Sequence, residues 1–172
     1  MTADELASAL GHEAADEMAS ALDRIKHCLG QLTDEQIWWR HSAAENSIGN
    51  LILHLCGNVR QWIVGGLGGA KDIRNRPAEF AERGPIPKGE LLRNLEAIVQ
   101  QAQAALKQLK AEQLLKNRQI QGQDVTGLKA IFDSVPHFRG HTQEIIHMTR
   151  TLCGPAYKFA WQPPEEGRGT RE

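Results

Sequence analysis

The sequence has no long apolar run, because no segment offers the ~18 uninterrupted apolar residues of a transmembrane helix. Its start, MTADELASALGHEAADE, is acidic and lacks the positive charge and apolar stretch of a secretory signal. An excess of one charge is also missing, since 20 Lys and Arg residues stand against 21 Asp and Glu residues. Because it has neither a signal segment nor a transmembrane segment, we expect the protein to be cytoplasmic. Because it lacks a broad basic surface, we expect it to bind neither nucleic acid nor membrane.

Cysteine is scarce, and the three cysteines, Cys28, Cys56 and Cys153, have no CxxC spacing. An odd number of cysteines without paired spacing argues against a disulfide framework and against a thiolate zinc site. The glycine-rich stretch GGLGGAKD lacks the GxxxxGK[ST] pattern of a phosphate-binding loop. We therefore interpret it as the end of a helix.

The overall composition is that of a folded globular protein, with 41% hydrophobic and 24% charged residues. The length of 172 residues suits one domain, which we assign to residues 1–160. The end of the chain is rich in Pro, Gly and charged residues, so we expect residues 161–172 to form a flexible tail.

Apolar residues recur at steps of three and four in four stretches, which is the pattern of amphipathic helices. Ser47 and Thr126 are natural N-caps of the second and fourth helices. Thr33, followed three residues later by Gln36, has the form of a capping box and predicts a short helical turn. The four predicted helices run approximately over residues 3–32, 48–64, 91–111 and 127–153.

Two connections separate these helices. Residues 70–88 are rich in charged residues, Asn and Pro, and predict a crossover loop between the second and third helices. Residues 112–126 lose the helical periodicity and predict a second connection. Four helices without a convincing strand or a fixed repeat indicate an all-α fold, a four-helix bundle. Pro136 either kinks the last helix or marks its first turn.

The seven histidines fall into two groups. Four of them lie on polar faces or loops, where surface or packing roles are expected: His12, His27, His41 and His147. His137 and His141 are four residues apart on one helix, so one metal ion can reach both imidazoles. HxxxH alone is a weak signal, because such pairs often only face solvent, but His54 lies amid apolar residues and supplies a third imidazole.

Three neutral imidazoles suit a divalent transition metal, Zn²⁺ or Ni²⁺, and leave coordination positions open. Several nearby side chains are expected either to orient these ligands or to be solvated: Asn50, Asn58, Asp133 and Glu144. Trp62 is expected to pack in the core, and the alternatives are that it lines a pocket mouth or a dimer face. No residue stands out as a general base.

The segments NSIGNLILHLCGNVRQWIVGG and VPHFRGHTQEIIHMTRTL resemble the DinB-like, or YfiT-like, metal-binding superfamily, and the resemblance extends over nearly the whole chain. It implies a four-helix bundle that binds metal through His54, His137 and His141. Members often carry a Gly-Gln or similar step after HxxxH, whereas this chain has Gln143 and Glu144. Some relatives are thiol-S-transferases or thiol-dependent isomerases, and relatives are commonly dimers.

Three hypotheses for function follow. The first is a metal-dependent enzyme that transfers a low-molecular-weight thiol to an electrophile or hydrolyses a small-molecule substrate, and acts as a homodimer. The second is a non-catalytic metal-binding protein with a stress-related or interaction role. The third is a metal-free bundle that acts through its surfaces alone.

Overall fold

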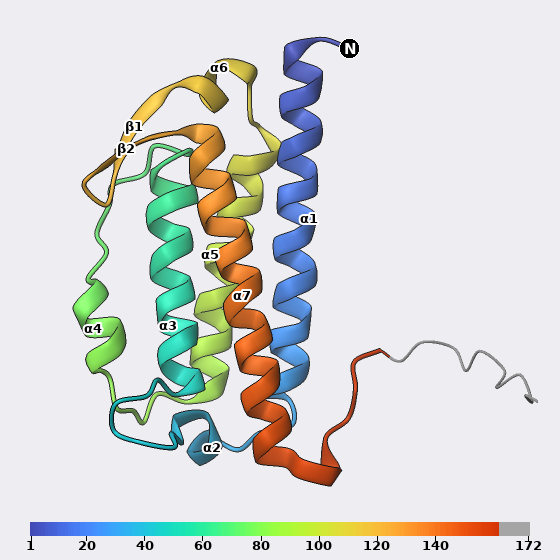
Figure 1. The fold of residues 1–172 in the computed structure, drawn as a ribbon, viewed down its shortest axis with the longest axis vertical. Coiled ribbons are helices and arrows are strands. Elements are labelled where there is room, and N and C mark those ends of the chain that lie inside the picture. Colours follow the sequence, from blue (N-terminus) through green and yellow to red (C-terminus); the bar gives the residue numbers. More distant parts are fainter. Residues whose placement is uncertain (162–172) are drawn as a thin grey trace, which may run out of the picture.

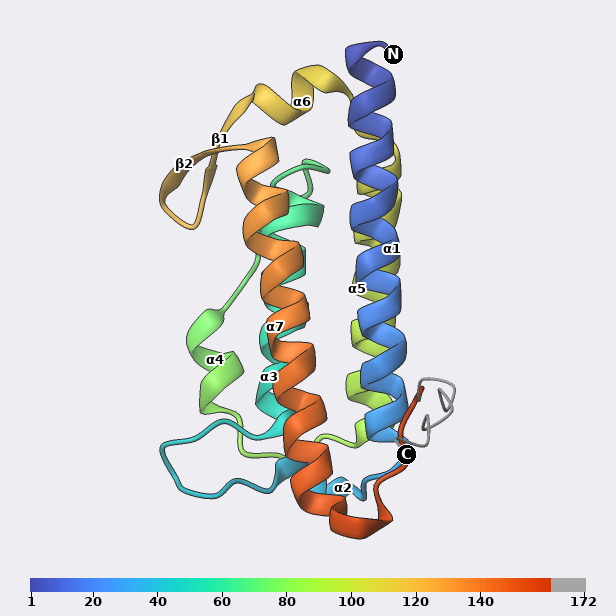
Figure 2. The ribbon, with the colours of Figure 1, turned by 45° about the vertical axis from the view of Figure 1, so that its right-hand side comes forward.

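Four long helices form the body of the protein in the computed structural model, which describes residues 1–161 (Figure 1). A π-helical segment, η1, continues the second of them directly. The four helices lie side by side in both views (Figures 1 and 2). Their bounds are α1 (Ala3–Leu29), α3 (Ile48–Val59) with η1 (Arg60–Gly65), α5 (Lys88–Lys107) and α7 (Gly127–Cys153). Within the described range, no helix is both long and apolar enough to cross a membrane.

Short elements occupy the connections between the long helices. They are α2 (Asp34–Trp38), α4 (Arg76–Ala81), α6 (Ala111–Leu115), β1 (Asn117–Ile120), β2 (Gln123–Thr126) and the 3-10 turn η2 (Gly154–Ala156). The strands pair antiparallel, with Asn117 opposite Thr126 and Ile120 opposite Gln123. The prediction of an all-helical chain without strands is therefore wrong for residues 117–126, although the chain is mostly helical.

The predicted N-caps are confirmed. Thr33 accepts a hydrogen bond from the backbone N–H of Gln36, and Ser47 accepts one from that of Asn50. Thr126 accepts the backbone N–H of Lys129 at the start of α7. Each cap satisfies a backbone donor that a helix start otherwise leaves free. The alternative in which the last helix begins at Pro136 is wrong, because α7 runs unbroken past it.

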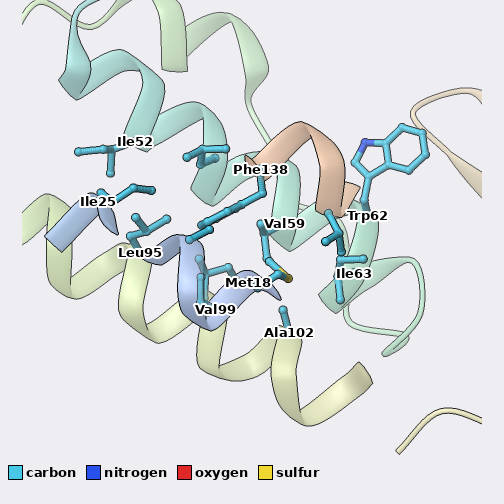
Figure 3. Close-up of a cluster of buried hydrophobic side chains, with 14 of the residues drawn as sticks. Met18, Ile25, Ile52, Val59, Trp62, Ile63, Leu95, Val99, Ala102 and Phe138 are labelled. Atoms are coloured by element: carbon cyan, nitrogen blue, oxygen red, sulfur yellow. The ribbon is translucent and has the colours of Figure 1, made fainter. Parts of the chain in front are cut away.

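The core fills the space between the four long helices (Figure 3). All four contribute fully buried side chains, among them Met18 from α1, Ile52 from α3, Leu95 from α5 and Phe138 from α7. Burial of apolar surface of this kind stabilises a fold by about 25 cal/mol per Å². α3 and α7 are therefore held as neighbours by packing, and this places their histidines close together.

The long connection between η1 and α5 runs along the outside of α3 and contains the short helix α4 (Figure 1). Asn75 caps α4, and Pro77 lies in its first turn. Of the predicted tail, residues 162–172 lie outside the described residues.

Candidate metal centre

Three histidines from two helices meet at one point. His54 comes from α3, and His137 and His141 come from successive turns of α7. Each offers one ring nitrogen, and these atoms all lie within 4.8 Å of one another. The ring centroids are 5.0 Å apart for His54 and His137, 5.2 Å for His54 and His141, and 4.5 Å for His137 and His141. The residues that the sequence selects as ligands are thus brought together.

The spacing of the nitrogens suits a single ion. Nε2 of His54 lies 2.9 Å from Nε2 of His137. Two imidazole nitrogens that bind one tetrahedral ion at 2.0–2.1 Å lie about 3.3 Å apart. Only small side-chain adjustments therefore separate this arrangement from a coordination sphere. Three nitrogen ligands are a donor set that divalent late first-row metals accept.

A carboxylate that the sequence did not reveal fixes the orientation of His54. Oε2 of Glu79, from α4, lies 3.0 Å from Nδ1 of His54, and both side chains are buried. A carboxylate accepts, so Nδ1 of His54 must carry the proton and donate it. This tautomer leaves the lone pair of Nε2 free, on the side that faces His137.

Arg74 holds Glu79 in place. Its Nε donates to Oε1 of Glu79 at 2.7 Å, and its Nη2 donates to Oε2 at 2.8 Å, which makes a bidentate ion pair. The same Nη2 also lies 3.1 Å from Nδ1 of His54. Since both of these nitrogens are donors in the tautomer set by Glu79, we interpret the second contact as proximity around a shared carboxylate rather than as a hydrogen bond.

The connection before α4 is itself tied to η1. Nη1 of Arg74 donates to Gln61 at 2.9 Å, and Gln61 donates to Asp72 at 2.8 Å. The hydrogen bonds from Gln61 and from the backbone N–H of Arg74 lower the pKa of the Asp72 carboxyl. This network connects the segment that carries Glu79 to the helix that follows His54.

A glycine makes room for the carboxylate. A Cβ added at Gly57, one turn after His54 on α3, would lie 1.9 Å from Oε1 of Glu79. No side chain larger than hydrogen fits there without moving Glu79. The close approach of α4 to α3 therefore depends on this residue.

A second carboxylate contacts the third histidine. Oε2 of Glu144 lies 2.7 Å from Nδ1 of His141, three residues earlier on α7. This is the contact expected of a residue that orients a ligand, and it leaves Nε2 of His141 free for the cluster. Two of the three imidazoles thus carry a carboxylate on the nitrogen that faces away from the centre.

Burial keeps the imidazoles of His54 and His137 in the form that binds metal. Burial, together with the neighbouring His141 and His54, lowers the pKa of His137 to about 4. Burial also lowers the pKa of His54, and the hydrogen bond to Glu79 opposes that shift. Both rings are therefore neutral near pH 7, as a metal ligand must be.

The other predicted residues do not touch the imidazole nitrogens. Asn50 donates to the backbone carbonyls of Glu79, at 2.9 Å, and of Glu82, at 3.0 Å, so it fastens the end of α4 to α3. Asn58 accepts from the hydroxyl of Ser134 at 2.9 Å. The remaining two, Trp62 and Asp133, line a cavity together with Asn58.

That cavity opens beside the histidines and has a volume of about 280 Å³. His54 and His137 form part of its wall. The other lining residues come from α3, η1, the connection before α4, the start of α4, the β-hairpin and α7: Asn58, Trp62, Arg74, Arg76, Gln121, Gln123 and Asp133. A small molecule in this space would face two of the three imidazoles.

Sequence reasoning missed Glu79 and Arg74. The signals for α4 were present, since Asn75 and Pro77 are a helix start and Glu79 falls in its first turn. Those signals identify a short helix and do not say which residue its carboxylate meets. The pairing with His54, 25 residues away, depends on the path of the connection around α3.

Comparison with known proteins supports the fold. A structure described as the crystal structure of the conserved protein of locus from Enterococcus faecalis matches with a TM-score of 0.67 at 18% sequence identity, over 82% of this chain and 95% of that one. At this identity the likeness shows a shared fold alone. No curated protein sequence matches the chain. The family model described as "Protein of unknown function (DUF1572)" matches residues 7–165. Since that match spans most of the sequence, the chain belongs to the DUF1572 family.

Proposed function

We propose that the protein binds one divalent transition metal, Zn²⁺ or Ni²⁺, through His54, His137 and His141, and that it is a metal-dependent enzyme of the DinB-like type. The observation that carries the proposal is the convergence of three ligand nitrogens within 4.8 Å of one another. The carboxylates on His54 and His141 support it, because they orient both rings as ligands.

A metal with open positions supplies a Lewis acid that activates a thiol or a water near neutral pH. Around it, the chain's own residues have distinct tasks. Glu79 and Arg74 fix the tautomer of His54, while Glu144 does the same for His141. The cavity beside His54 and His137 admits a small-molecule substrate. The proposed reaction is transfer of a low-molecular-weight thiol or hydrolysis of a small substrate.

We further propose that the protein acts as a homodimer in the cytoplasm. The exposed ring of Phe132 stands in an apolar cleft between α1 and α7, lined also by Leu10, Ile131, Val135 and Pro136. An exposed apolar face of this kind is a common means of self-association. Sedimentation equilibrium of the wild-type protein and of Phe132→Glu tests this, and a monomeric wild type at tens of micromolar rejects it.

Metal analysis of protein purified without an affinity tag tests the central proposal. We expect close to one Zn²⁺ or Ni²⁺ per chain, with anomalous scattering placing the ion between the three imidazoles. His137→Ala should abolish stoichiometric metal. His12→Ala is the matched control, because His12 is exposed on α1. Full metal content in His137→Ala contradicts the assigned site.

Activity assays then separate an enzyme from a non-catalytic metal protein. Metal-loaded protein is incubated with a thiol and an electrophile, and separately with ester and amide substrates. Turnover that disappears in His141→Ala supports the enzyme. If the metal-loaded parent protein shows no turnover in any assay while metal still raises its melting temperature, the enzyme hypothesis is wrong. The non-catalytic metal-binding protein with a stress-related or interaction role is then favoured.

A further inference from the structure

The cavity beside the histidines has one wall whose charge is not balanced. Three charged side chains line it, and two of them are paired: Arg74 with Glu79, and Asp133 with Lys129. Arg76 is exposed, and among the described residues no carboxylate pairs with it. Its guanidinium lies 4.9 Å from the centre of the Phe80 ring. The cavity therefore presents one guanidinium with free donors.

The β-hairpin also lines the cavity, and its packing against the body of the protein holds it there. Ile120 and Val125 are buried, at 3% and 5% exposure, and anchor the hairpin to the body of the protein. Gln121 and Gln123 remain exposed and line the cavity. Their amides offer neutral hydrogen-bond donors and acceptors to a ligand.

The backbone of the hairpin turn is strained at the residue that lines the cavity. Gln121 has a φ of 54° and Gly122 has a φ of 75°, so both turn residues lie in the left-handed region. Asn or Gly is the favoured residue at the first position of such a turn, and Gln carries a steric cost there. Strain kept at one residue is a feature of functional sites.

Trp62 adds an unused hydrogen-bond donor to the same wall. The residue is 6% exposed, and its indole Nε1 is buried without a partner among the described residues. Its ring stands at the edge of the core cluster (Figure 3). Because this N–H has no partner among the described residues, it can donate to a ligand without breaking an existing hydrogen bond.

We propose that this cavity binds a small ligand that carries a single carboxylate, with Arg76 as the anchor of the carboxylate and Gln121 as a second contact. The inference rests on the proposed metal site, which holds the other end of the ligand. One guanidinium matches a monoanion in charge and geometry. A volume of about 280 Å³ limits the ligand to a small molecule.

Cobalt-loaded protein and a matched pair of probes test the proposal. The probes are 3-mercaptopropionate and its amide, 3-mercaptopropanamide, which differ only in the charge at the far end. Binding is followed in the visible spectrum of Co²⁺, which changes when sulfur becomes a ligand. We expect the acid to bind about tenfold tighter than the amide or more, with a preference that decreases as salt is added.

Variants assign the preference to residues. Arg76→Gln should reduce the ratio of the two dissociation constants to near one, whereas Arg93→Gln, an exposed arginine on α5, should leave it unchanged. Gln121→Gly should weaken binding of the acid and at the same time raise the melting temperature by about 2–4 °C, because it relieves the turn. A role of Gln121 in folding alone would leave the probe affinities unchanged.

The outcomes distinguish this inference from the metal proposal. If the protein does not bind Co²⁺ at the histidines, both are wrong. If Co²⁺ binds and both probes bind equally well, the carboxylate site is wrong and the metal site stands. If the preference survives Arg76→Gln, the assignment of the anchor is overturned.

Discussion

Glu79 is the residue on which the orientation of His54 depends. It accepts from Nδ1 of His54 and is held by two hydrogen bonds from Arg74. Glu79→Gln removes the charge but keeps the shape, so we expect zinc affinity to decrease about 10–100-fold. Competition with a chromophoric chelator measures this, and Glu90→Gln, at an exposed position of α5, is the control. Unchanged affinity in Glu79→Gln would show that its hydrogen bond to His54 does not tune the site.

Gly57 tests the same contact from the other side. Ala is a better helix former than Gly by up to about 1 kcal/mol, so a free position would gain stability. At Gly57 the new Cβ would lie 1.9 Å from Glu79, so we expect Gly57→Ala to lower both the free energy of unfolding and the zinc affinity. Gly140→Ala on α7 is the matched control, because nothing lies within 4 Å of its Cβ, and it should gain stability. Equal gains in denaturant midpoint for both variants would contradict the contact.

Among single residues, those with a distinctive position in the sequence could be predicted as site residues, and those without one could not. His137 and His141 stand one turn apart, and His54 interrupts an apolar helix face, so each could be selected from local pattern. Glu79 is one of many carboxylates in a charged stretch. Only the folded chain shows that it is buried, at 8% exposure.

At the scale of elements, α4 acts as the support of the histidine cluster. Asn50 on α3 donates to two backbone carbonyls, of Glu79 and Glu82, that α4 leaves free at its end. Asn50→Ala removes these donors, and we expect it to lower the free energy of unfolding by about 1–3 kcal/mol. Hydrogen exchange of the amides of residues 76–82 should accelerate more than that of α5. Asn94→Ala, at an exposed position of α5, is the control and should change neither. Uniform acceleration across the chain would instead indicate a general loss of stability.

The long helices were predictable because each carries its own evidence. Ser47 and Thr126 mark the starts of α3 and α7, and apolar periodicity marks the buried faces. The hairpin was not predictable in the same way. Its strands are four residues each, and its turn is Gln-Gly rather than the Asn-Gly or Asp-Gly that signals a hairpin. Packing of Ile120 and Val125 decides the structure there, and local preference does not.

At the scale of the whole molecule, the proposed ion would join two helices that are distant in sequence. His54 and His137 are 83 residues apart, so an ion bound by both would hold together two distant parts of the folded chain. Since the sequence carries ligands on only two of the four helices, metal should stabilise the contact of α3 with α7 and leave α1 and α5 to apolar packing. The fold therefore should exist without metal and become more stable with it.

This difference gives a measurable prediction for zinc. At a free concentration 100-fold above the dissociation constant, an ion that binds only the folded state adds about 2.7 kcal/mol, which corresponds to a rise in melting temperature of roughly 5–10 °C. His141→Ala should lose most of this rise, whereas His147→Ala, at an exposed position of the same helix, should keep it. The metal-free form of both variants should remain helical by circular dichroism, because the buried faces of all four long helices are intact. If zinc stabilised His141→Ala as much as the parent protein, the ion would bind elsewhere. If the metal-free parent protein were unfolded, the ion would be required for folding.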